Sequence, residues 1–584
     1  MRKLIIILCL FLPLLITSCS KDEPSRGLLR YNGHIVFERF HFDVSGTDAT
    51  IVEYTGNETT VTVPTTIDDY VDNEPVTYTV KHIGNRAFEN KPLNHITLPG
   101  TLKTIGDQAF NNCANLAEIQ LPSSLTSIGN RAFQNTAIRE ITIPSGTLGD
   151  NVFGNTKLEK VVLGSGVRNI PAREFSSDNL GGSTLTSVTF PSDLLSIGEM
   201  AFAGNRLNEL NIPSVKAIGN SAFQDSYYLE NVSLPATLNE LGNSAFKNCV
   251  RLATIQLPSS LASIGNEAFY NTAIREITIP SGTLGSNVFG NTQLERVVIG
   301  SGVRSIPDAE FSSANLGGST LTSVTFSGNL SSIGAEAFAG SSITQLSIPS
   351  VTTIGVSAFT ECKKLTTVSL GDGIERISAT AFKDCSQLRN MSISPTLNEI
   401  GDYTFQGTAI EEFTLTTTNL GTQIFYQCPL KTLHIGANII AIPDNFREHL
   451  VSYITNTLHT ITFSEGLVTI GNHAFENLIH VAEIDMPSTV TTIGERAFYN
   501  MNCNKITLGS SVSYIGDEAF KTNYNNLNSL TFKGKNPPVI SATTGRYSAG
   551  PYCKFYVPQE SLEAYTQVLQ SAFIFYGSNS IIGY

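Results

Sequence analysis

The 584-residue chain contains no tryptophan, and charged residues make up only 15% of it. No basic run is present and the formal net charge is −13, so the chain should repel phosphate backbones and anionic lipid headgroups. This argues against nucleic acid as a partner and against direct adsorption to a membrane. The apolar fraction of 41% is nevertheless high enough to fill a large core, so disorder is not expected.

Residue patterns that carry common catalytic chemistry are also missing. No histidine lies between His95 and His434, and no nucleophile elbow, phosphate-binding loop, repeated carboxylate pair or C-x-x-C motif is visible. We therefore expect no enzyme activity, no metal and no cofactor. The late histidines are interpreted as scattered surface residues, although His434 is predicted to share an outward strand position with Thr462 and Asp485 on the following turns.

The N-terminus has the pattern of a secretory signal, residues 1–18. Arg2 and Lys3 precede the apolar residues 4–16, a run too short to cross a bilayer comfortably, and small residues follow it. The sequence Ile-Thr-Ser-Cys at residues 16–19 resembles a lipobox, whose cysteine becomes the first mature residue and receives the lipid. A plain signal peptide with an incidental cysteine is the alternative. We expect lipidation of Cys19, followed by a tether over residues 19–30.

A candidate sorting signal follows the cysteine. Residues 20–23, Ser-Lys-Asp-Glu, are similar to the acidic export signal of lipoproteins in Bacteroides-type bacteria. The similarity implies a lipid-anchored protein of the outer membrane that faces the cell exterior, with the lipid on Cys19 as its membrane contact. The alternative is an ordinary polar tether.

One pattern recurs from about residue 81 to residue 535: L-x-x-I-x-L-P-x-x-L-x-x-I-G-x-x-A-F-x-x-C/T/S. Its phenylalanine recurs at steps of mostly 20 to 23 residues, which is the period of leucine-rich repeats. In one copy, Ile119 and Leu121 alternate with Glu118 and Gln120, which predicts a short strand with one buried face. Pro122 cannot donate to a ladder and should end that strand.

The second half of each copy should return the chain. Leu125, Ile128, Ala132 and Phe133 fall at helical offsets, and Gly129 is expected to permit the bend between them. Stacked copies then predict an α/β repeat fold. This is a leucine-rich-repeat solenoid of about 20 turns, with a parallel β-sheet on one face and short helical turns or loops on the other.

The residues of this pattern carry a family resemblance. Proline after the strand, Ile-Gly, Ala-Phe and a small residue or cysteine three places on resemble the BspA-like leucine-rich repeat surface lipoproteins of Bacteroides-type bacteria. Residues 31–80, which include Val-Thr-Val-Pro at 61–64, look like an N-terminal cap, and residues 536–584 resemble the C-terminal cap of that family. The resemblance implies adhesion to host matrix proteins or to other cells.

A longer period is superimposed on the short one. Residues 119–171 and 255–307 differ at only 8 of 53 positions, at an offset of 136 residues, and a third, diverged copy begins near Phe382. Six turns at about 4.8 Å per strand place the same surface roughly every 29 Å. The longest turns recur at this interval, with S-S-x-N-L-G-G-S-T at residues 176–184 and 312–320, and a changed counterpart at 447–457.

These repeats indicate where a partner should bind. The outward strand positions form a row rich in serine and threonine, which can hydrogen-bond an extended partner or can simply keep the sheet soluble. Loops on a rigid scaffold often carry recognition, which adds the long turns. The candidate ligand-binding residues are Gln120, Thr142, Asn179, Gln256, Thr278 and Asn315.

The cysteines of the repeat are predicted to be structural. Five of them lie three places after the repeated phenylalanine, where other turns carry Thr136 or Ser226, and this interchange indicates small buried side chains. A disulfide between Cys362 and Cys385, which fall on adjacent turns, stays open. These five are Cys113, Cys249, Cys362, Cys385 and Cys428.

The sequence thus predicts a non-catalytic cell-surface binding protein that acts through its repeat surface. The expected partners are host matrix or cell-surface proteins, or other bacterial cells. The alternative is capture of glycans or nutrients beside an outer-membrane uptake system. Nucleic acid is not expected.

Overall fold

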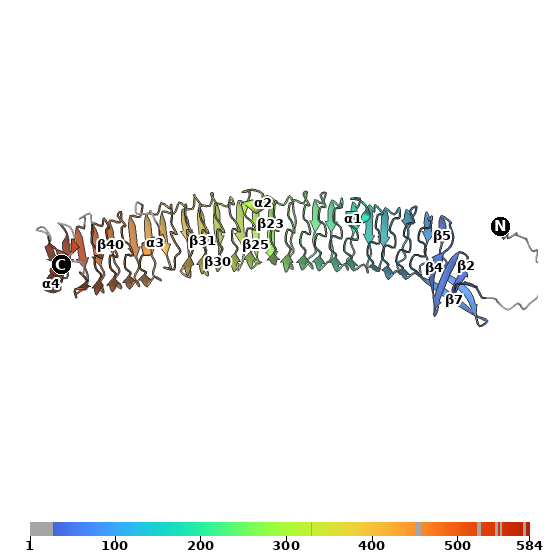
Figure 1. The fold of residues 1–584 in the computed structure, drawn as a ribbon, viewed down its shortest axis with the longest axis horizontal. Coiled ribbons are helices and arrows are strands. Elements are labelled where there is room, and N and C mark those ends of the chain that lie inside the picture. Colours follow the sequence, from blue (N-terminus) through green and yellow to red (C-terminus); the bar gives the residue numbers. More distant parts are fainter. Residues whose placement is uncertain are drawn as a thin grey trace, which may run out of the picture.

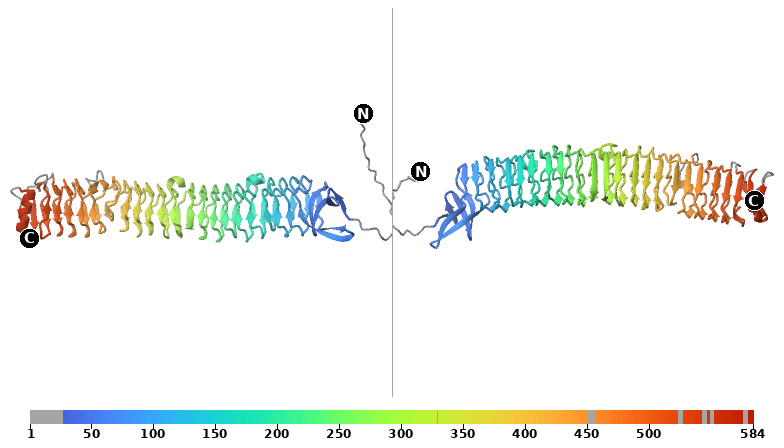
Figure 2. Two further views of the ribbon diagram at one scale, coloured as in Figure 1. Left: turned by 60° about the horizontal axis from the view of Figure 1, so that its bottom comes forward. Right: turned by 180° about the vertical axis from the view of Figure 1, so that it is seen from behind.

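The computed structural model describes residues 27–584, apart from residues 329, 451–456, 523–526, 543–546, 549–551 and 576–579. The chain winds into a long, gently bowed rod in which each turn stacks on the previous one (Figure 1). A small antiparallel β-structure covers the N-terminal end of the rod, and a helix lies at the other end (Figure 2). The signal segment and Cys19 lie outside the described residues.

One face of the rod is a succession of short parallel strands, as the sequence predicted. In the strand at residues 140–143, Ile141 and Ile143 are buried and Thr142 is exposed, which is the alternation expected for a sheet with one face in the core. We call this side the strand face. Its strands are β5 (Thr60–Thr62), β8 (His95–Thr97), β10 (Glu118–Ile119), β12 (Glu140–Ile143), β14 (Lys160–Leu163), β16 (Ser187–Thr189), β18 (Glu209–Asn211), β20 (Asn231–Ser233), β23 (Glu276–Ser281), β25 (Arg296–Gly302), β27 (Ser323–Phe326), β29 (Gln345–Ile348), β31 (Thr367–Leu370), β33 (Asn390–Ser392), β35 (Glu412–Leu415), β36 (Thr432–Ile435), β38 (Thr460–Phe463), β40 (Glu483–Asp485), β42 (Lys505–Leu508), β44 (Ser529–Phe532), β47 (Lys554–Val557) and β49 (Ser580–Gly583).

A second parallel ladder, which the sequence analysis did not predict, runs along another side of the rod. Ile128, assigned above to a helical spacing, lies in the two-residue strand β11 (Ser127–Ile128), which pairs with the equivalent strands of the turns before and after it. The other strands of this ladder are β9 (Thr104–Ile105), β13 (Thr147–Leu148), β15 (Asn169–Ile170), β17 (Ser196–Ile197), β19 (Ala217–Ile218), β21 (Glu240–Leu241), β22 (Ser263–Ile264), β24 (Thr283–Leu284), β26 (Ser305–Ile306), β28 (Ser332–Ile333), β30 (Thr353–Ile354), β32 (Arg376–Ile377), β34 (Glu399–Ile400), β37 (Ala441–Ile442), β39 (Thr469–Ile470), β41 (Thr492–Ile493), β43 (Tyr514–Ile515) and β45 (Val539–Ile540).

Helix is rare because the neighbouring turns, rather than the turn itself, satisfy the backbone. Phe133 N–H, for example, donates to the Val152 carbonyl of the next turn, at 2.9 Å. A helix would need that bond within its own segment. Short helices occur only in the long turns and in the C-terminal cap of the described chain: α1 (Ser177–Leu180), α2 (Ser313–Leu316), α3 (Phe446–Leu450) and α4 (Leu562–Ala572).

The repeated glycine has a different role from the one predicted. Gly129 is not in the left-handed region, which Arg131 (φ 54°) and Asn135 (φ 59°) occupy instead. A Cβ on Gly129 would lie 2.6 Å from the backbone nitrogen of Asp107 on the preceding turn. Glycine is therefore needed because two turns approach closely at this point, and not because the chain bends there.

Asparagine ladders connect the turns near this corner. Asn135 Nδ2 donates to Asn112 Oδ1 at 2.7 Å, and Asn155 Nδ2 donates to Asn135 Oδ1 at 2.8 Å. Asparagine tolerates the left-handed backbone that this position requires, and its amide both donates and accepts. The same side chain therefore makes the bend and binds the next turn.

Stacked phenylalanine rings form the centre of the core. The ring centroids of Phe246 and Phe269 are 5.7 Å apart and those of Phe269 and Phe289 are 5.6 Å apart, with nearly parallel planes. The stacking continues from Phe88 as far as Phe425, whereas Phe446 meets Phe475 edge-on at 75°. The changed geometry coincides with the diverged third copy of the long turn.

The cysteines of the repeat lie beside this column as free, fully or almost fully buried thiols. Cys113 Sγ donates to the Phe88 carbonyl of the preceding turn at 3.1 Å, and Cys385 Sγ donates to that of Phe359 at 3.1 Å. Thr136 instead donates to the carbonyl of its own Phe133. Cys362 and Cys385 are both thiols in this structure.

Each of the first two long turns contains a buried glutamate. Glu174 is fully buried and takes the position that alanine has in other turns. Its carboxylate accepts the N–H groups of Val152 at 3.1 Å and Phe153 at 3.3 Å, and Glu310 accepts those of Val288 and Phe289. Burial raises the pKa of both glutamates to about 8, in spite of these donors.

The ends of the rod are closed by different structures. At the N-terminus, the antiparallel strands β1 (Leu29–Tyr31), β2 (His34–Phe37), β3 (Phe40–Ser45) and β4 (Asp48–Tyr54) lead to the hairpin of β6 (Thr66–Val71) and β7 (Glu74–Ile83). Strand β7 then begins the second ladder by pairing with β9. At the C-terminus, α4 buries Tyr565, whose hydroxyl donates to the Gly534 carbonyl at 2.8 Å; β46 (Tyr547–Ser548) pairs with β48 (Phe573–Ile574) at this end.

The phenylalanine column predicts a sharp contrast between two adjacent residues. Phe269→Ala should lower the free energy of unfolding by about 3–5 kcal/mol, since the ring is fully buried between two others. Tyr270→Ala should cost under about 1 kcal/mol, because this side chain is partly exposed. Denaturant unfolding measures both changes. Equal losses at the two positions would contradict the assigned core.

The buried glutamates predict a dependence of stability on pH. An acid whose pKa is about 8 when folded and 4.5 when unfolded binds its proton more tightly in the folded chain, so stability should fall as the pH rises from about 5 to 8. The double variant Glu174→Gln/Glu310→Gln should lose this part of the dependence. Denaturant midpoints at pH 5.5 and 8.0 test it, with Glu159→Gln/Glu295→Gln as an exposed control. A double variant with the same pH dependence as the native chain would refute the assignment.

Candidate binding surface on the strand face

The four strand residues predicted from the sequence all lie on the strand face with exposed side chains. Gln120 and Thr142 belong to consecutive turns of the first six-turn copy, and Gln256 and Thr278 belong to the equivalent turns of the second. Thr142 is level with Val162 of the next strand, and Thr278 is level with Val298. The structure therefore gathers these side chains into two pairs and leaves the pairs far apart along the rod.

The hydrogen-bonded ladder of the strand face is interrupted at intervals, which divides the face into blocks. We call each interruption a parting. Strands β12, β14 and β16 pair with one another, and so do the equivalent β23, β25 and β27, and β35, β36 and β38. Among the residues that the structure describes, no strand pairing joins these blocks to the strand-face turns on either side. Gln120 and Thr142 flank one parting, and Gln256 and Thr278 flank its copy. The sequence contains no direct signal for this division.

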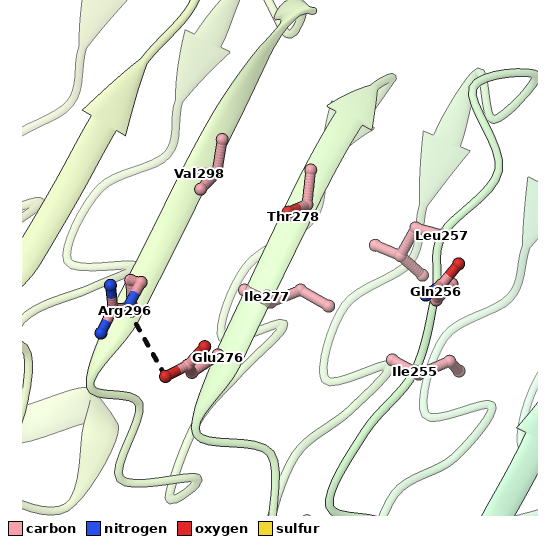
Figure 3. Close-up of a pocket in the computed structure, with 8 residues that line it drawn as sticks. All are labelled: Ile255, Gln256, Leu257, Glu276, Ile277, Thr278, Arg296 and Val298. Atoms are coloured by element: carbon pink, nitrogen blue, oxygen red, sulfur yellow. Dashed lines mark ion pairs between the residues drawn. The ribbon is translucent and has the colours of Figure 1, made fainter.

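A shallow groove lies over the second of these partings. It has a volume of about 420 Å³ and is formed by three neighbouring turns, with Gln256 and Leu257 on one side and Thr278 and Val298 on the other (Figure 3). A larger hollow of about 1060 Å³ continues from it toward the N-terminus, over β16, β18, β20 and residues 254–256. Gln256 and Glu276 line both, so the two form one continuous surface.

Ion pairs between adjacent turns border the groove. Glu276 Oε1 lies 3.5 Å from Arg296 Nε, and Arg275 and Glu295 pair at 2.5 Å one residue earlier on each turn. The first copy has the same arrangement, with Arg139 and Glu159 at 2.6 Å. Their side chains are about half exposed, so solvent screens these pairs and each adds little stability. They fix the pattern of charge presented to a partner.

Asn179 and Asn315 lie in the long turns, where they have structural partners. The amide of Asn179 donates to the Glu174 carbonyl at 2.5 Å, and its backbone N–H donates to Ser176 Oγ, the N-cap of α1. Asn315 makes the same contacts in α2. These partly buried side chains are held by their own turns, and the structure does not bring them together with the four strand residues.

The differences between the two copies avoid the strand-face row. Between residues 119–171 and 255–307, Gln120 and Gln256, Thr142 and Thr278, and Val162 and Val298 are identical pairs, and the change from Lys160 to Arg296 keeps its charge. At the corner after the second ladder, by contrast, Arg131 becomes Glu267 and Asp150 becomes Ser286. That corner has its own groove of about 530 Å³ in the first copy, lined by Asn85, Arg86, Asp107, Gln108, Asn130, Arg131, Asp150 and Asn151.

The late histidines are only partly brought together. His434 Nδ1 lies 2.6 Å from Thr462 Oγ1, as its predicted strand position required, and Nε2 lies 2.9 Å from Glu412. Asp485 belongs to the next block and pairs with Lys533 at 3.2 Å instead. Within the described residues, no group of histidine, cysteine and carboxylate side chains is arranged to hold a metal ion. None of the described helices has the length and apolar character needed to cross a membrane.

A cluster that was not predicted from the sequence lies beside the larger hollow. Arg206, Tyr228 and Arg251 occupy equivalent positions of three consecutive turns, and both guanidinium carbons lie 5.1 Å from the centre of the tyrosine ring. These positions have no fixed residue type in the repeat, so no periodic signal points to them. The contact of the two arginines with the tyrosine depends on the register between neighbouring turns. The spacing of the repeat alone defines that register only to within one residue.

Known proteins share the repeat of this chain. The family model for the BspA type leucine rich repeat region (6 copies) matches residues 81–208, 179–292, 244–359, 313–431 and 449–542. Similar solved structures include a leucine-rich repeat protein from Bacteroides ovatus, with 22% identity and a TM-score of 0.45 over 74% of this chain and 100% of that one. A leucine rich cell surface protein from Faecalibacterium prausnitzii has 21% identity and a TM-score of 0.30 over 74% and 94%.

The pneumococcal vaccine antigen PcpA matches over 94% of this chain and 98% of its own, with 17% identity and a TM-score of 0.21. A comparison with curated proteins gave no match. These structural similarities are too distant to assign a partner. The family match is extensive enough to assign the family, because its segments together span well over half of the chain. The protein is therefore a member of the BspA-type leucine-rich repeat family.

Proposed function

We propose that this protein is a non-catalytic binding protein of the cell surface, held at the outer membrane by a lipid on Cys19. Its strand face adheres to host matrix or cell-surface proteins, or to other bacterial cells. The observation that carries the proposal is the contrast between the two six-turn copies. Over residues 119–171 and 255–307, the outward strand positions stay identical except for the change from Lys160 to Arg296, while the corner on another side changes its charges. A surface kept unchanged across a duplication that varies elsewhere is the side expected to bind.

The chemistry of the face supports a macromolecular partner. The groove is shallow and open, and its outward side chains include the amide of Gln256, the hydroxyl of Thr278 and the apolar Val298, with bordering ion pairs. Such a surface suits a long partner that makes many hydrogen bonds, rather than a small molecule that needs an enclosing pocket. A glycan could use the same groups, so polysaccharides belong in the binding screen beside matrix proteins.

Membrane attachment should depend on one sulfur atom. Cys19→Ala should abolish labelling with radioactive palmitate and prevent normal lipoprotein processing, because the lipid is transferred to that thiol. Cys113→Ala, which removes a buried cysteine, serves as the control and should still be labelled. Undiminished labelling of the Cys19 variant would show that the lipobox assignment is wrong.

The duplication should provide avidity for a repetitive or fibrous partner. Two weak identical sites that engage together can bind about 10²–10⁴ times more tightly than one. A fragment that keeps one six-turn copy, with both caps grafted on to cover its cut ends, should therefore bind far more weakly than the whole solenoid. Surface plasmon resonance on an immobilised partner from the screen compares them. Equal affinities would mean that the duplication only lengthens a spacer.

Point variants then test which side binds. Thr142→Arg/Thr278→Arg on the strand face should weaken binding of the whole solenoid at least tenfold by obstructing both copies. Asp150→Arg/Ser286→Arg places the same side chains at the other corner and should leave binding within about twofold. If only the corner variant loses binding, the strand face is not the binding side.

A further inference from the structure

One three-turn block of the strand face differs from its equivalents. It consists of the paired strands β18 and β20 and of residues 254–257 on the following turn, which form no strand, and partings separate it from β16 before it and from β23 after it. The larger hollow lies over this block, and its outward side chains include Asn211, Ser233 and Gln256. These residues offer hydroxyl and amide groups in a row, one from each turn.

The cluster of Arg206, Tyr228 and Arg251 lies along the edge of this block, and we call it the Arg-Tyr-Arg column. Each member directly precedes the first buried leucine of its turn and comes three residues before Glu209, Asn231 or Thr254, which line the hollow. The strand register supports this alignment of Arg206 with Tyr228, since Glu209 is level with Asn231. Tyr228 is 38% exposed, and both arginines are exposed.

Stacking holds the two guanidinium groups without using their hydrogen-bonding edges. Arginine on an aromatic face keeps its N–H donors free for a carboxylate, and less conformational entropy is lost when that carboxylate binds. Arg251 shares its donors with Glu230 at 3.2 Å, in a pair whose side chains are more than half exposed. Among the described residues, Arg206 forms no ion pair with any carboxylate. The column therefore presents one free cation and one that a stronger partner can recruit.

The column occurs in one copy only. The positions 136 residues further on hold Ser342, Lys364 and Gln387, which cannot form a ring between two guanidinium groups. The feature is thus a single contact point on an otherwise repeating face. Tyrosine and arginine are also the residue types that dominate binding energy in protein interfaces.

We infer that the Arg-Tyr-Arg column anchors an extended, acidic polypeptide segment of the partner, whose backbone lies across the hydroxyl and amide row of the block. The inference deepens the proposed function and rests on it. Carboxylates of the segment pair with Arg206 and displace Glu230 from Arg251, because bidentate pairing to a preorganised guanidinium outweighs an exposed ion pair. Peptide groups then bind Asn211, Ser233 and Gln256.

Local charge makes this recognition selective. Glu230 pairs with Arg251, Glu209 lies three residues after Arg206, and the whole chain carries a net charge of −13, so the chain as a whole repels an acidic segment. Only direct contact with the two guanidinium groups offsets the repulsion. The two arginines are thus expected to decide both the affinity and the position of the segment.

The absence of tryptophan allows a direct test. Tyr228→Trp keeps an aromatic ring between the arginines and introduces the single tryptophan of the full mature chain, whose fluorescence reports the column. Titration with an end-blocked hexaglutamate peptide should change this fluorescence in a saturable manner, and hexalysine should not. Tyr270→Trp is the matched control, since Tyr270 also stacks with a cation, Lys247, at 5.0 Å but lies away from the strand face.

Two further substitutions in the Tyr228→Trp background separate the arginines from their neighbours. Arg206→Gln should weaken the apparent Kd for hexaglutamate at least tenfold. Glu230→Gln should strengthen it severalfold, because Arg251 then loses its internal competitor. Circular dichroism shows whether each variant is folded, and both positions are exposed enough to accept the change.

The outcomes discriminate clearly. A flat titration, an equal response at Tyr270→Trp, or an affinity that Arg206→Gln leaves unchanged would overturn the inference. A response to a sulfated polysaccharide but not to hexaglutamate would overturn it too, in favour of a glycan. None of these results touches the two-copy avidity assay, which judges the proposed function separately.

Discussion

The structure depends on the pairing of each turn with the turns on either side of it. Backbone hydrogen bonds of the two ladders, asparagine amides and stacked phenylalanine rings all connect residues about 20 to 27 positions apart and almost never residues within one turn. A single turn keeps a few local bonds, such as that from Leu116 N–H to the Cys113 carbonyl, but without its neighbours it loses the ladder and asparagine hydrogen bonds and leaves its apolar side chains half covered. It acquires a stable conformation only within the stack, which explains why both ends need a cap.

This constraint also decides which side of the rod is free to vary. A Cβ at Gly129 would crowd the preceding turn, although Pro171 and Ser378 occupy the equivalent position in other turns, and the phenylalanine rings are fully buried, so substitutions are expected mainly on the outward strand positions and at the corner beside the left-handed residues. Between residues 119–171 and 255–307, the corner has changed its charges and the strand row has not. Residues at the corner and in the strand row can both change without damage to the core. The absence of change in the strand row therefore supports the proposal that this row binds a partner.

The partings divide the otherwise uniform strand face into distinct blocks. They recur with the six-turn period, isolate blocks of three turns and place the predicted pairs Gln120 and Thr142, and Gln256 and Thr278, at equivalent interruptions of the ladder. The block with the Arg-Tyr-Arg column lies between two of them. On the proposed function, a repeated surface with one distinctive contact would combine avidity for a long partner with a fixed starting point for binding.

The sequence alone determined the solenoid, the strand face and the phenylalanine core, because strict periodicity leaves few ways to bury Ile141, Ile143 and Phe153 on every turn. It also identified the exposed strand row, since alternation in a strand has only two phases. It misassigned Ile128 and Gly129, because a spacing that suits a helix also suits a short strand, and only neighbouring turns decide between them. The buried position of Glu174, the partners of Asn179, the partings and the stacking of Arg206 on Tyr228 depend on the alignment of residues some 20 positions apart. That alignment is set by the packing of whole turns, which no local pattern encodes.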